Sequence, residues 1–184
     1  MTGDYATFSC PQDLNFTGSD LRAYIASGYN KATNQILLTY VTDVPAGTGV
    51  FLVGTPGETY KIPYATSTSY YMNLFKANLE KGLINATTED RTNYIYSGED
   101  GSAGFVPVVD NVKLLSQTAY LQLPTDFVAP GVKVSFVFEE DIVDGIENFR
   151  IDDSEDSIYD LSGRRRDRIQ RGINIVNGKK VLVK

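Results

Sequence analysis

The chain has 184 residues, of which 42% are hydrophobic, and it carries a formal net charge of −6 with no histidine. This length predicts one main domain with its own core, and the acidic charge disfavours nucleic acid as a partner because phosphate binding needs a concentrated basic surface. Without histidine, Ser-His-Asp and Cys-His catalysis and the common zinc sites are excluded.

The N-terminal residues lack the features of an export signal. Residues 1–4 contain neither a basic stretch nor an apolar stretch of the kind found in signal peptides. We therefore expect any export signal to lie upstream of this chain. No apolar run approaches the roughly 20 residues that span a bilayer, so we predict no transmembrane segment.

Cys10 is the only cysteine, so it cannot form a disulfide within the chain. It precedes Pro11 and has no basic neighbour in the sequence that would lower its pKa. We interpret Cys10 as a half-buried structural residue rather than as a reactive thiol.

Residues 1–138 are expected to form a tyrosine-rich all-β module. Alternation of apolar and other residues is clearest at 132–138, which predicts a strand with one buried face that closes the main sheet. Further strands are expected at 21–26, 35–42, 50–53, 59–63, 94–96, 104–109 and 119–123. Glycine- and proline-rich turns at 45–49, 54–57 and 98–101 separate them. Many short strands joined by tight turns favour an antiparallel β-sandwich or an open barrel.

One short helix is predicted within this module, at residues 71–83. Leu74, Phe75 and Leu79 stand at helical spacing, and Gly82 is placed to end the helix. We expect one or two turns lying across a sheet edge.

The composition changes after Phe138. Residues 139–157 are strongly acidic, with Arg150 as the only cation, a pattern typical of a solvated linker. A calcium-binding loop is the alternative, because carboxylates are the ligands that calcium prefers, but the ligand spacing of an EF-hand is not present. The sequence favours the linker and assigns no metal site.

Residues 158–184 form a basic tail with a predicted three-stranded meander. Its last two apolar segments flank Asn177-Gly178, the dipeptide that most strongly indicates a tight β-hairpin. With fewer than thirty residues, the tail has too little core for comfortable independent stability. The three predicted parts of the chain are thus a β module (1–138), an acidic linker (139–157) and a small basic β tail (158–184).

Residues 158–165, 171–175 and 177–184 of the tail carry a resemblance to a known family. The tail resembles the C-terminal segment of many large secreted surface proteins of Bacteroidetes such as Bacteroides and Prevotella, and it is similar to the C-terminal sorting domains of the type IX secretion system. Gly163, Gly172 and Lys184 occupy the positions at which that family has two glycines and a terminal lysine. It implies a secreted or cell-surface location, on the exterior of the outer membrane, and contact with the secretion machinery or cell-surface components through the tail.

The body carries a second resemblance, at residues 5–8, 13–16, 21–26, 44–50 and 119–121. These residues resemble an uncharacterised β module that precedes this tail in such surface proteins. The resemblance implies location and architecture and lends no catalytic residue. We therefore assign no catalytic, cofactor-binding or metal-binding residue, expect no cofactor, and leave the ligand-binding residues unknown.

Three function classes follow. The first is a non-catalytic C-terminal β module of a larger exported protein, acting as a spacer and presentation domain next to the sorting-like tail. The second is a glycan-binding or adhesion module, since the chain has 12 tyrosines, including Tyr64, Tyr70 and Tyr71, although tyrosine also packs well in strands and tryptophan is absent. The third is a glycoside hydrolase accessory that uses paired carboxylates, for which no particular pair stands out. We favour the first and predict that the chain is not an enzyme.

Overall fold

The computed structural model describes residues 3–98, 103–127, 131–142, 158–160, 165–166, 171–176 and 179–183. Its elements are strands, and the only helical element among the described residues is the 3-10 turn η2 (Glu139–Asp141). The all-β class predicted from the sequence is confirmed.

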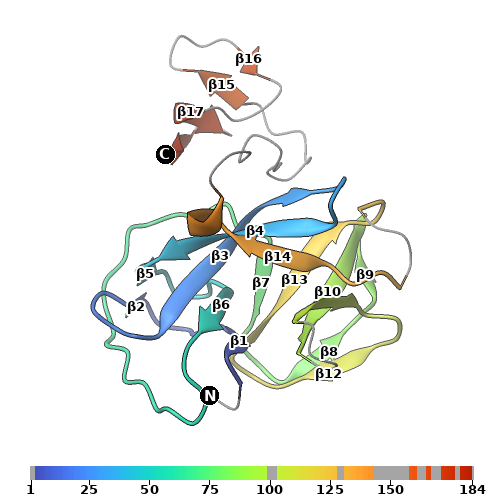
Figure 1. The fold of residues 1–184 in the computed structure, drawn as a ribbon, viewed down its shortest axis with the longest axis horizontal. Helices are drawn as coiled ribbons and strands as arrows, with labels where there is room; N and C mark the ends of the chain where they lie inside the picture. The colour runs from blue at the N-terminus through green and yellow to red at the C-terminus, as the bar shows by residue number, and fades with distance from the viewer. Residues whose placement is uncertain are drawn as a thin grey trace.

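The body contains two main curled sheets (Figure 1). The first has the order β1 (Tyr5–Phe8), β6 (Val50–Val53), β3 (Arg22–Asn30), β4 (Gln35–Val41), β14 (Ser135–Phe138). The second has the order β11 (Gly104–Pro107), β10 (Arg91–Ser97), β13 (Thr118–Pro124), β7 (Phe75–Asn78), with β9 (Thr87–Thr88) paired on β10. Two small sheets pair β2 (Leu14–Asn15) with β5 (Asp43–Val44) and β8 (Gly82–Ile84) with β12 (Val112–Leu114).

Backbone hydrogen bonds join the two main sheets at several places, including the following two. On one side, Phe105 and Val134 exchange both backbone hydrogen bonds at 2.8 Å and so connect β11 to the chain just before β14. On the other side, Ser9, which follows β1, donates its backbone N–H to the carbonyl of Gln117 at 3.1 Å and its hydroxyl to that of Thr118 at 2.7 Å. Two curled sheets joined in this way form the predicted sandwich or open barrel.

The main core lies between these sheets and is rich in aromatic rings. Phe51 of β6 is fully buried. Its ring centroid lies 5.0–6.3 Å from the rings of Tyr5, Phe75, Tyr96, Phe105 and Phe136. These distances are the ones that aromatic pairs prefer, and the rings come from both sheets, so this cluster holds the two layers together.

A second core covers the other face of the first sheet. Ala23, Ile25 and Leu52 point into it from β3 and β6, and Leu14, Phe16, Leu21 and Val44 cover them. Tyr60, Ile62 and Tyr71 pack against it from the long segment between β6 and β7. Because β3 is covered on both faces, it reads as an almost continuous buried run.

The strand at residues 132–138 was predicted to close the main sheet, and β14 does lie at the edge of the first sheet. Its pairing is parallel to β4, with Ser135 opposite Gln35 and Phe138 opposite Leu38. The sheet is therefore not purely antiparallel. The chain crosses over from the second sheet before it enters β14, so the two strands have no hairpin turn that would force them to run in opposite directions.

The helix predicted at residues 71–83 is wrong, because this stretch contains β7 and β8. Leu74 and Phe75 are buried, whereas Leu79 and Leu83 are 37% and 65% exposed. The helical spacing was thus fortuitous, and β7 satisfies its backbone groups by pairing with β13, some forty residues later. The strand expected at 59–63 is also absent; this stretch is irregular, although Tyr60 and Ile62 are partly buried.

The described residues of the C-terminal segment form four strands rather than the predicted three. Their order is β16 (Arg165–Arg166), β15 (Ile158–Asp160), β17 (Gly172–Val176), β18 (Lys179–Val183). The extra strand β16 was missed because two arginines carry no apolar alternation. The hairpin of β17 and β18 is confirmed, with Val176 opposite Lys179, while Asn177-Gly178 itself lies outside the described residues, as does most of the acidic segment (143–157).

The division of the chain into three parts stays a prediction. In the described portion of the chain, the strands between 158 and 183 pair only with one another.

Candidate functional site

The longest irregular segment of the body, residues 54–74, connects β6 to β7 (Figure 1). Between residues 64 and 70 its side chains alternate in exposure, as those of an extended chain do. The exposed side chains are those of Tyr64, Thr66, Thr68 and Tyr70, which we call the outward row. Tyr64 is 75% exposed and Tyr70 is 67% exposed.

Backbone pairing fixes the start of this segment. Asn15 donates its N–H to the carbonyl of Pro63 at 3.1 Å, and Ala65 donates to the carbonyl of Asp13 at 3.0 Å. Tyr64 thereby forms an antiparallel bridge with Leu14 of β2. The segment continues the small β2–β5 sheet beyond its edge.

The carboxylate of Asp13 fixes the middle of the segment. Its Oδ2 accepts the N–H of Ser67 at 2.8 Å, and its Oδ1 accepts the N–H of Ala46 at 2.6 Å. These two hydrogen bonds favour the ionised form of the carboxylate. They hold the pKa of Asp13 below its ordinary value, and the bond from Ser67 contributes more than the bond from Ala46.

The carboxylate of Asp43 in β5 is the second anchor. Its Oδ2 accepts the hydroxyls of Ser67 at 2.7 Å and Ser69 at 2.5 Å. The backbone carbonyl of Asp43 also accepts the phenol of Tyr71 at 2.8 Å. The inward side chains are therefore bound to the body, and the alternation of the chain directs the outward row toward solvent.

The tyrosine pair named from the sequence divides between the two faces. Tyr70 belongs to the outward row, whereas Tyr71 packs on the second core. Burial, with a smaller contribution from the charge of Asp43, holds the pKa of the Tyr71 phenol above its ordinary value, despite the opposing hydrogen bond from Ser69. Tyr71 thus packs against the body and does not belong to the outward row.

Thr66 and Thr68 were missed in the sequence. The signal that would have identified them is the alternation in residues 64–70, YATSTSY, which is the period of an extended chain with two different faces. The serine and threonine content of residues 64–70 is that of an ordinary loop. The alternation of residue types was therefore the only indication in the sequence.

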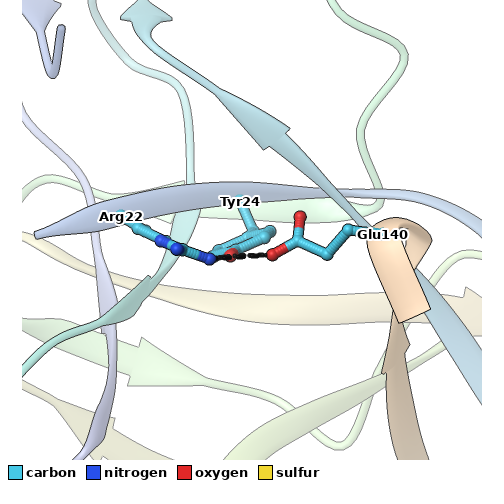
Figure 2. A network of polar contacts seen from close by, with 3 residues as sticks. All are labelled: Arg22, Tyr24 and Glu140. Carbon is cyan, nitrogen blue, oxygen red and sulfur yellow. Dashed lines mark hydrogen bonds and ion pairs between the residues drawn. The ribbon is translucent and has the colours of Figure 1, made fainter.

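A second polar cluster lies where the chain leaves the body (Figure 2). Glu140 of η2 accepts hydrogen bonds at 2.9 Å from Arg22 and from the phenol of Tyr24, both on β3. Burial raises the pKa of Tyr24, so its phenol stays protonated and donates. This cluster ties the start of the acidic segment to the central strand of the first sheet.

The remaining candidates have structural roles or lie outside the described residues. Cys10 is half-buried, as expected, and its thiol contacts the Gln12 side chain at 3.3 Å. The described residues contain no group of three or more Cys, Asp or Glu side chains arranged to hold a metal ion. The calcium alternative concerned residues 139–157, most of which are not described, so it stays untested.

No helix in the described part of the chain is long and apolar enough to cross a membrane. Comparison of the chain with family models, with curated proteins and with solved structures found no match. The resemblance to Bacteroidetes surface proteins and their sorting domains therefore stays a prediction.

Proposed function

We propose that this chain is a non-catalytic β module of a larger exported bacterial surface protein, acting as a spacer that presents a fixed surface beside a sorting-like tail. The proposal rests on the structural role of the two carboxylates that hold the outward row, those of Asp13 and Asp43. Asp13 and Asp43 accept hydrogen bonds from backbone amides and serine hydroxyls. Carboxylates employed in this way hold the surface in place and are poorly suited to general acid or base catalysis.

The exit of the chain supports the spacer role. Glu140 is bonded to Arg22 and Tyr24, so the acidic segment leaves from a fixed point on β3. An acidic, self-repelling segment tends to extend, and it would separate the body from the tail. The tail strands pair among themselves, as a unit recognised separately from the body would.

The test compares the native protein with a version that lacks residues 158–184, by cell fractionation and by the mass of the C-terminus. We expect the native protein at the cell surface and the shortened version retained inside the outer membrane. If both versions reach the same location and the tail is retained, the sorting role is refuted and the tail is a structural addition to the body.

The non-catalytic part of the proposal is tested separately. The purified chain is incubated with a panel of neutral and acidic polysaccharides, and new reducing ends are measured. We expect none above the level of an Asp13→Asn, Asp43→Asn double variant. Release of reducing ends by the unmodified chain would refute the non-catalytic proposal.

A further inference from the structure

We propose that the outward row, Tyr64, Thr66, Thr68 and Tyr70, binds an uncharged polysaccharide laid along the segment. The inference rests on the proposed function, since it names what a non-catalytic surface module would hold. It uses two exposed tyrosines on a segment whose backbone the body holds from beneath.

The chemistry of the row fits a neutral sugar chain. The two tyrosines end in a phenol hydroxyl, and the two threonines end in a methyl and a hydroxyl. None of the four side chains carries a charge. Tyrosine offers a flat apolar ring with a polar tip, which suits the mixed apolar and hydroxylated faces of a pyranose. Threonine hydroxyls both donate and accept hydrogen bonds, as sugar hydroxyls do.

Charge selects against acidic glycans. The row has no cation to pair with a carboxylate or a sulfate, and the chain as a whole carries a net charge of −6. The carboxylates of Asp13 and Asp43 are bonded to Ser67, between Thr66 and Thr68 of the row, and so add negative charge next to it. A neutral chain meets none of the repulsion that an anionic chain would meet.

The spacing of the tyrosines indicates a polymer rather than a single sugar. Tyr64 and Tyr70 are six residues apart on an extended chain, which corresponds to roughly 20 Å at the usual rise of a strand. One monosaccharide reaches only one of these rings. An oligosaccharide long enough to lie over both, with Thr66 and Thr68 between them, gains contacts along its whole length.

The anchors reduce the cost of binding. Ser67 and Ser69 hold the segment through Asp13 and Asp43, and Thr66 and Thr68 are β-branched and therefore stiff at χ1. A surface that is already ordered loses little conformational entropy when a ligand binds. An extended loop without such anchors would have to be ordered by the ligand itself.

The experiment is affinity electrophoresis of the full chain in gels that contain neutral polysaccharides (a β-1,4-glucan, a β-1,3-glucan, a xylan and a mannan) or anionic ones (polygalacturonate and heparin). We expect retardation in at least one neutral gel and none in the anionic gels. Tyr64→Ala and Tyr70→Ala should each weaken binding about tenfold, the loss expected when one aromatic contact is removed.

The matched control is Tyr40→Ala. Tyr40 is also exposed, at 41%, but it lies on β4 and its ring packs 5.7 Å from that of Tyr24. This variant should bind as the unmodified chain does. Thermal unfolding of each variant establishes that it is folded, which is expected for Tyr64 and Tyr70 because their side chains are largely exposed.

Titration calorimetry with oligosaccharides from the retarding polymer adds a second readout. Affinity should rise with length until both rings are covered and then level off. The inference is overturned if no neutral gel retards the chain, if only anionic gels do, or if Tyr64→Ala and Tyr70→Ala bind as Tyr40→Ala does. Binding followed by release of reducing ends would instead refute the non-catalytic proposal and leave the binding row intact.

Discussion

At the scale of single residues, two glycines stand where the main sheets come into close contact. A Cβ on Gly49 would lie 3.0 Å from the Cβ of Ala119 and 3.1 Å from the backbone of Lys76. A Cβ on Gly104 would lie 2.8 Å from the carbonyl oxygen of Val134. Both glycines stand beside sheet junctions, so we attribute them to close backbone approach rather than to turn formation.

Gly104→Ala should therefore destabilise the body by about 1–3 kcal/mol, the usual cost of inserting a methyl group where atoms are already in contact. Gly82→Ala in β8 is the matched control, because its added Cβ would meet nothing closer than 3.9 Å. Urea denaturation of both variants checks this. Equal stabilities of the two variants would show that β11 and β14 separate without cost.

The carboxylate of Asp13 predicts a dependence on pH. Its pKa is lowered in the folded protein, so its stabilising contribution is complete above the pKa of an unfolded aspartate, about 3.9. That contribution is lost as the pH falls from there through the lower folded pKa.

Asp13→Asn retains one acceptor but loses the second, so it should be less stable than the unmodified chain at pH 7. As the pH falls from about 4 to about 2, the difference in stability between the two proteins should shrink, because only the unmodified chain loses the contribution of this carboxylate. Thermal unfolding at a series of pH values measures it. A difference that stays constant with pH would contradict the assigned role.

At the scale of elements, one side chain bonds to two strands and to the residue before a third. The Asn73 amide donates to the carbonyl of Gly49 at 2.7 Å and accepts the N–H groups of Ala26 at 3.0 Å and Phe75 at 3.1 Å. These groups belong to β3, β7 and the residue before β6. Asn73 therefore helps to align the two main sheets beside the backbone hydrogen bond from Leu74 to Ala26.

Asn73→Ala should cost about 2–4 kcal/mol, because it leaves three partly buried backbone groups without their partner. Asn111→Ala, at an exposed position before β12, is the matched control and should change the stability by less than about 0.5 kcal/mol. Chemical denaturation gives both values. A loss for Asn73→Ala as small as that of the control would mean that water replaces the amide.

At the scale of the whole molecule, β14 connects the layers. It pairs with β4 in the first sheet, and Phe136 packs against both Phe51 of that sheet and Phe105 of the second. The chain then ends the body at Glu140, bonded to Arg22. The body thus depends on β14, which is the last of its own strands along the chain.

A chain that ends at Ile142 should therefore keep the body folded, whereas a chain that ends at Gly131 should lose it. The shorter chain exposes the edge of β4 and removes Phe136 and Phe138 from the main core, and an exposed apolar edge favours aggregation. Near-ultraviolet circular dichroism and thermal unfolding distinguish the two. Cooperative unfolding of the shorter chain would refute the role of β14.

The sequence by itself determined the all-β class, most strand positions and the C-terminal hairpin, because these depend on turn residues and on the period of two along a strand, which are local properties. Only the tertiary structure decided the parallel pairing of β14, the strands in place of a helix at 71–83, and the different roles of Tyr70 and Tyr71. Each of these depends on partners far away in the chain, such as Gln35 for Ser135. No local pattern specifies such a partner, because the pairing energy is gained only when distant segments meet.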